Sequence, residues 1–232
     1  SIFQKAISGS HDYDEDIRAM ALQGQGVKTI YETLSRRDVQ SAADEFRPLY
    51  DKTEGADGYV SLEVDPHLAH DTRGTVEEAR RLWAALDRPN VLIKVPATAE
   101  GLPVIRQLIS EGININVTLI FSEQRYRQVA DAYMTGLERR LQAGGSLDHI
   151  ASVASVFVSR IDTLVDALLE ERLTQGAGAA GIARLRGKAA VANTKAIFQA
   201  FKEVFGSPRF AALQKQGAAL QRPLWGSTGT KN

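Results

Sequence analysis

The sequence has no cysteine, little tryptophan and methionine, and no excess of charge of either sign. Its 232 residues include 28 basic and 28 acidic side chains, so the formal net charge is zero. The absence of cysteine excludes disulfides, thiol nucleophiles and thiolate metal sites, and the four histidines have no spacing typical of metal ligands. A neutral chain has no general attraction to nucleic acid or to an anionic membrane. We therefore expect neither a metal site nor a nucleic-acid partner.

Long hydrophobic runs are also missing. No apolar run approaches the roughly 20 residues that a membrane-spanning helix needs, and the first residues show no basic region followed by an apolar one. Hydrophobic residues still make up 44% of the chain, as in an ordinary globular protein. The composition favours a cytoplasmic protein with one domain over residues 1–232 and no membrane partner, and it gives no oligomeric state.

What the sequence does contain is a repeated pattern of a short apolar run, a turn and a longer segment of helical period. This pattern is typical of β/α units. Strands are expected at residues 58–64, 90–95, 113–121, 149–158 and 223–227, and helices at 76–86, 102–111, 122–142, 160–175 and 181–205. Thr75 with Glu78 is typical of a capping box, and Ser122 indicates another helix start. The expected fold class is α/β, with the strands forming part of a parallel (β/α) barrel.

A single lysine, Lys94, interrupts the apolar run of residues 91–96. Burial disfavours the charged form of a lysine side chain and so lowers its pKa. A buried lysine can therefore be an uncharged amine near neutral pH, and such an amine can attack a carbonyl carbon and form a Schiff base. The alternative is that Lys94 lies at the strand end with its ammonium in solvent. The residues on the neighbouring expected strands distinguish the buried amine from the solvent-exposed one.

Polar residues occur late in several of the expected strands. Because the carboxyl ends of parallel strands in a barrel converge on one mouth, these side chains are expected to face a single pocket with Lys94. Each of them also has an ordinary structural explanation, since threonine favours strands and asparagine favours turns. Their joint placement is what indicates a site, and its members are Glu63, Asn116, Thr118, Ser155 and Ser227.

Four ordered stretches carry a family resemblance. They are residues 61–65 (SLEVD), 92–98 (LIKVPAT), 112–122 (GININVTLIFS) and 155–160 (SVFVSR). In these stretches, and across nearly the whole chain, the sequence resembles a transaldolase of the long bacterial form, which is sometimes fused to a sugar-phosphate isomerase. The implied fold is a (β/α)8 TIM barrel, of which residues 1–232 would supply about five strands.

The resemblance implies a metal-free transfer of a dihydroxyacetone unit from a ketose phosphate to an aldose phosphate in the pentose phosphate pathway. Lys94 matches the Schiff-base nucleophile, and Glu63 and Thr118 match the pair that moves protons through a water. Asn116 and Ser155 match positions that bind substrate hydroxyls. Arg160 matches the phosphate anchor, and Ser227 and Lys231 lie where further phosphate contacts occur. No cofactor is implied, because the imine itself is the electron sink.

The chain also departs from the family pattern. The family's first strand supplies an aspartate that takes a substrate proton, and no residue here matches it, nor does any residue match the last barrel strand. The resemblance therefore suggests a form truncated at both ends, and a catalytically silent fragment is one alternative to an active enzyme. A second is a fructose 6-phosphate aldolase, although Glu63 argues against it, since that group uses a tyrosine to position its water. A deoxyribose-phosphate-type aldolase would need a second lysine near Lys94, for which Lys188 and Lys195 are the candidates.

Overall fold

The computed structural model describes residues 2–174, 181–182 and 184–229. The chain divides into two compact units, one made of residues 1–62 and 84–91 and the other of residues 63–83 and 92–232. The elements β1 (Val60–Glu63), α4 (Thr72–Leu86) and β2 (Val91–Pro96) each contain residues of both. We describe the units one at a time.

The first unit contains three helices, α1 (Ile2–Gly9), α2 (Asp14–Leu22) and α3 (Val27–Lys52), of which α2 packs on α3. Buried Asn90 fastens α3 to the loop before β1, because its Nδ2 donates to the carbonyl oxygens of Ala43, at 2.7 Å, and Gly58, at 2.9 Å. The sequence pattern does not predict these helices. The reason is that α3 buries only five of its 26 residues, so its apolar period is weak.

The strands form one sheet in the order β1-β2-β3-β4-β5, with β3 at Ile115–Ile120, β4 at Ser152–Phe157 and β5 at Arg222–Gly226. The pairs from β2 to β5 are parallel. The expected strands are confirmed, with β1, β3 and β4 shorter at both ends and β2 and β5 shifted by one residue. The expected fold class is confirmed as α/β with five parallel strands of an incomplete barrel. No described helix is long and apolar enough to cross a membrane.

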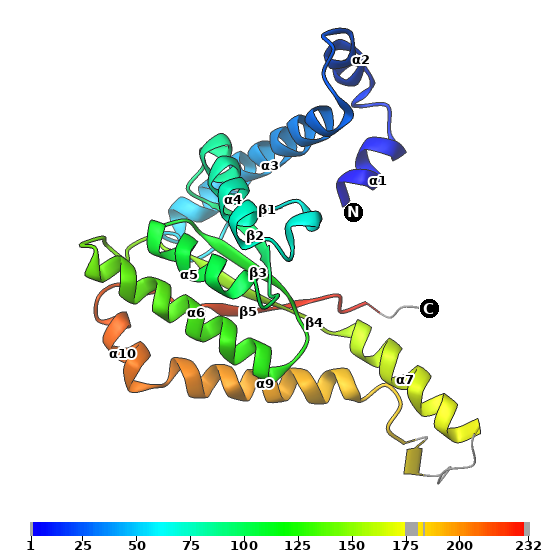
Figure 1. Cartoon of the computed structure of the whole chain (residues 1–232), viewed down its shortest axis with the longest axis vertical. Helices are drawn as coiled ribbons and strands as arrows, with labels where there is room; N and C mark the ends of the chain where they lie inside the picture. The colour runs from blue at the N-terminus through cyan, green and yellow to red at the C-terminus, as the bar shows by residue number, and fades with distance from the viewer. Residues whose placement is uncertain (1, 175–180, 183, 230–232) are drawn as a thin grey trace. The chain divides into compact units, whose positions relative to one another are not determined.

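The helices of the second unit connect consecutive strands. Besides α4, the described part of this unit contains α5 (Gly101–Glu111), α6 (Glu123–Gln142), α7 (Ser159–Thr174), α9 (Ala189–Phe205) and α10 (Pro208–Gln214), with a short 3₁₀ turn η1 at Pro66–Leu68. Helices α5 and α6 pack side by side against the sheet (Figure 1). Gly136 permits this approach, since a Cβ there would lie 2.7 Å from Cβ of Ile109. The core is therefore the layer between these helices and β2 to β4.

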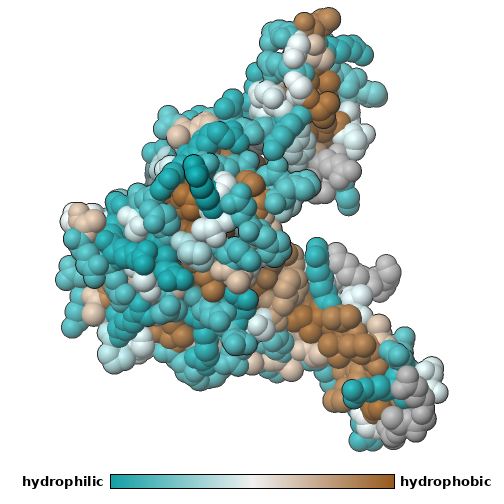
Figure 2. Space-filling model, in the orientation of Figure 1, coloured by the Kyte–Doolittle hydropathy of each residue, from teal (hydrophilic) through white to brown (hydrophobic). Residues whose placement is uncertain are grey.

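Helix α7 is the exception to this packing. It buries none of its residues, and Leu164 and Leu168 are exposed on it. Figure 2 shows the resulting hydrophobic surface over α7. Helix α9, in contrast, buries Ile197 and Ala200 and packs on both α6 and α7.

The two expected helix starts have different outcomes. Ser122 is confirmed as the N-cap of α6, because its Oγ accepts from the Arg125 backbone N–H at 3.2 Å. The capping box of Thr75 and Glu78 is wrong. Helix α4 begins at Thr72, so Thr75 is already helical and its hydroxyl donates to the Leu68 and Asp71 carbonyls. Glu78 instead accepts from the Asp65 backbone N–H at 2.8 Å, which fastens the loop after β1.

Two buried tyrosines of α6 give a matched test of this core. Tyr133 donates its hydroxyl to the Ala219 carbonyl at 2.8 Å, whereas the buried Tyr126 hydroxyl has no hydrogen-bond partner within the described part of the chain. Burial also raises the pKa of Tyr126. We expect Tyr126→Phe to raise the free energy of unfolding by about 1 kcal/mol and Tyr133→Phe to lower it by about 1 kcal/mol. Urea denaturation of the two variants measures both, and equal effects would contradict the packing described.

Candidate functional site

Lys94 extends from β2 toward the end of β1. Its Nζ donates to Oε2 of Glu63 at 3.2 Å, and the Lys94 and Glu63 side chains are 29% and 48% exposed. The two strands are joined there, because the Val64 backbone N–H donates to the Lys94 carbonyl at 3.2 Å. Lys94 is thus neither a lone buried amine nor fully in solvent. It is a partly buried amine paired with a carboxylate.

The sheet register places the next candidates on the same face. In the parallel pairing of β2 with β3, Lys94 is opposite Asn116 and Pro96 is opposite Thr118. Asn116 and Thr118 are two residues apart, so their side chains share the Lys94 face. Both are buried, as is Ser155 on β4, which donates its hydroxyl to Oδ1 of Asn116 at 2.7 Å. The sequence does not reveal this bond, which joins β3 and β4 on the face that carries Lys94.

Arg160, Ser159 and Ser227 lie together beyond the carboxyl ends of β4 and β5. The Arg160 guanidinium carbon lies 5.1 Å from the centre of the Phe157 ring, and Arg160 itself is exposed. Ser227 has its hydroxyl 3.0 Å from that of Ser159, and its carbonyl accepts from the Ser159 backbone N–H at 2.8 Å. Sequence reasoning does not single out Ser159, because no pattern in the chain indicates its pairing with Ser227. Lys231 lies outside the described residues.

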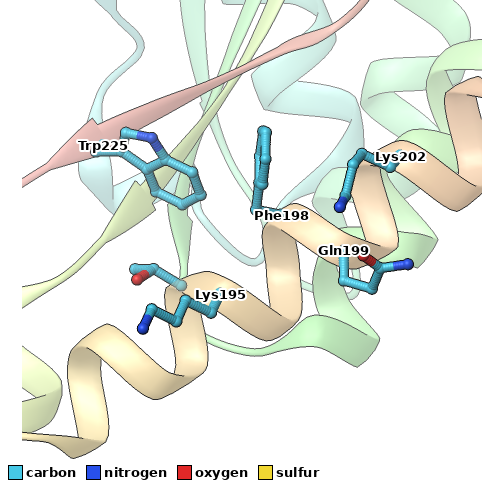
Figure 3. A pocket seen from close by; sticks show the side chains of 6 residues that line it. Lys195, Phe198, Gln199, Lys202 and Trp225 are labelled. Atoms are coloured by element: carbon cyan, nitrogen blue, oxygen red, sulfur yellow. The ribbon is translucent and has the colours of Figure 1, made fainter.

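A surface hollow of about 430 Å³ lies elsewhere in this unit. Figure 3 shows it between α9 and β5, with Phe198 and Trp225 facing each other across it. Trp225 is paired with Val156, whereas its neighbour Leu224 is paired with Ser155. Since successive strand residues point to opposite faces, Trp225 and the hollow are on the face opposite Ser155. The hollow also includes Lys195, so this lysine of α9 is not part of the Lys94 site.

The arrangement is suited to amine chemistry on a carbonyl compound. It combines a primary amine, a carboxylate 3.2 Å away, a buried hydroxyl and amide on the same sheet face, and an exposed guanidinium near the strand ends. An amine beside an acid–base group is the pairing that imine formation requires. Among the described residues, no group of three or more His, Asp or Glu side chains is placed to hold a metal ion.

Comparison with known proteins identifies the family of the chain. The family described as "Transaldolase/Fructose-6-phosphate aldolase" matches residues 1–232. The chain belongs to this family. The expected resemblance to transaldolase is therefore confirmed, and it covers the whole chain.

Curated members of the family are similar to the chain along its full length. Proteins named "Transaldolase" from Saccharopolyspora erythraea and Acidothermus cellulolyticus are 52% and 51% identical to it, and "Transaldolase 2" from Streptomyces coelicolor is 52% identical. In each case the match covers 100% of this chain and 61% of the relative. The chain spans about three fifths of the length of the curated relatives that it matches.

Proposed function

We propose that this chain carries the Schiff-base chemistry of a transaldolase. Lys94 attacks C2 of fructose 6-phosphate or sedoheptulose 7-phosphate, and the C2 oxygen leaves as water to give a protonated imine. When the C3–C4 bond breaks, the imine accepts the electron pair, the C4 hydroxyl loses its proton to solvent, and the C4 fragment leaves as an aldose phosphate. The dihydroxyacetone unit is then transferred to an aldose phosphate. The observation that supports this proposal is the 3.2 Å pair of Lys94 and Glu63 on the sheet face that carries Asn116 and Thr118.

The other residues take roles that follow from their chemistry. Glu63 and Thr118 hold the water through which protons move during carbinolamine formation and dehydration. Asn116 and Ser155, whose side chains are hydrogen-bonded to each other, bind substrate hydroxyls. Arg160 binds the substrate phosphate, for which a guanidinium fork is well suited, and Ser227 and Lys231 add contacts.

The proposal includes the setting of the reaction. We place the chain in the pentose phosphate pathway of the cytoplasm, as a single partial barrel domain over residues 1–232. Its partners are sugar phosphates, and the reaction needs no cofactor because the imine is the electron sink.

Borohydride trapping tests the proposal without requiring a complete catalytic cycle. The chain is incubated with fructose 6-phosphate, reduced, digested, and analysed by mass spectrometry for a stable adduct on the peptide that contains Lys94. We expect one adduct per chain, located on Lys94. Labelling of Lys195 in preference to Lys94, or no adduct on a chain that circular dichroism shows to be folded, would contradict the proposed chemistry.

A further inference from the structure

Strand β3 contains an irregularity next to Thr118. Its register against β4 is regular as far as the pair of Val117 and Ala154 and resumes with the pair of Ile120 and Val156. Two residues of β3, Thr118 and Leu119, therefore lie opposite one residue of β4, Ser155, which is the arrangement of a β-bulge. Both Thr118 and Ser155 are candidate site residues.

Leu119 has a left-handed backbone, with φ at +63°. This conformation is uncommon for residues other than glycine, asparagine and aspartate, and inside a strand it costs free energy. Burial of the Leu119 side chain does not offset this free-energy cost, because the residue is 38% exposed. Strained backbone that lacks a packing reason is concentrated at functional sites.

The bulge decides which side chain follows Thr118 on the site face. Without the extra residue, Ile120 would be opposite Phe157 and would point to the same side as Ser155. With it, Ile120 is opposite Val156 and is fully buried on the helix side, so the next residue, Phe121, returns to the face of Phe157. The rings of Phe121 and Phe157 meet edge to face, with centroids 5.6 Å apart.

The Phe121–Phe157 ring pair in turn supports Arg160, whose guanidinium carbon lies 5.1 Å from the Phe157 centroid. A guanidinium over an aromatic face is held by the ring quadrupole, and the side chain then loses less freedom when it binds an anion. We infer that Leu119 is a positioning residue: its left-handed bulge presents Phe121 to Phe157 and thereby orients Arg160 toward the phosphate of the substrate. This inference rests on the proposed function, because it assigns the phosphate to Arg160.

Two substitutions of similar size separate backbone conformation from packing. Leu119→Val introduces a β-branched residue that strongly disfavours positive φ, whereas Leu119→Asn introduces a residue that tolerates it. For each, borohydride trapping compares fructose 6-phosphate with unphosphorylated fructose. We expect Leu119→Val to lower the preference for the phosphorylated ketose at least about tenfold, since a hydrogen bond to a charged group is lost, and Leu119→Asn to retain it. Phe121→Leu keeps the bulge but removes the ring, and we expect the same loss, which covers the case in which Leu119→Val does not fold.

A nuclear Overhauser effect between the Phe121 and Phe157 rings gives a readout independent of catalysis. We expect it in the unchanged chain and in Leu119→Asn, and we expect its loss in Leu119→Val. An unchanged ring contact in folded Leu119→Val would overturn the inference, and so would an unchanged phosphate preference in Phe121→Leu. If the unchanged chain forms no adduct with either ketose, the proposed function fails, while the ring contact still decides whether Leu119 sets the register.

Discussion

Replacing Lys94 by methionine is expected to abolish adduct formation with fructose 6-phosphate. Methionine has a similar length and no nucleophilic nitrogen, so the rate of imine formation should fall by at least roughly a thousandfold. The stability of the chain should change little. The ion pair with Glu63 is half exposed, and a pair of this kind contributes at most about 1 kcal/mol. The measurement is the yield of borohydride-reduced adduct beside the urea midpoint of the same sample.

Lys195→Met is the matched control for this experiment. Lys195 is an exposed lysine of α9 on the other face of the sheet, so its loss should leave adduct formation unchanged. An adduct yield that survives in Lys94→Met, or that falls equally in both variants, would show that trapping reports general lysine reactivity. Severe unfolding of Lys94→Met would identify Lys94 as a structural residue instead.

The strands were predictable because each one combines an apolar run with turn residues at its ends. The run that contains Lys94 is buried at Val91, Leu92, Ile93 and Val95, so its pattern is strong. The same reasoning fails where burial is slight. Helix α2 buries only Met20, so the apolar period of its sequence is too weak to predict a helix.

The position of the candidate residues on one sheet face was predictable, but the contacts between them were not. Position late in a strand indicates that Asn116, Thr118 and Ser155 share one sheet face. It does not indicate that Ser155 donates to Asn116, because that bond depends on the register between β3 and β4. The bulge could not be predicted from the sequence either. Leucine has no preference for a positive φ, so the backbone conformation of Leu119 is imposed by tertiary structure.

Glu63→Gln is expected to have the second largest effect on the chemistry. Glutamine keeps the shape of the side chain and a hydrogen-bond acceptor for Lys94, but it cannot accept and return a proton near neutral pH. If Glu63 moves protons through a water with Thr118, the rate of imine formation should fall by about 10²- to 10⁴-fold while Lys94 remains the labelled residue. The measurement is the time course of adduct formation in samples reduced at successive times, repeated across a range of pH.

The pH dependence separates proton transfer from simple loss of charge. A general acid–base role for Glu63 predicts that one limb of the pH–rate profile disappears in Glu63→Gln. Glu77→Gln is the control, because Glu77 is an exposed glutamate of α4 paired with Arg73 of the same helix, and its profile should match that of the unchanged chain. A Glu63→Gln profile that keeps its shape and only shifts downward would mean that the carboxylate orients Lys94 without moving protons. The 3.2 Å contact would then be an ion pair that holds the amine in place, and the proton carrier would have to be sought at Thr118 or in solvent.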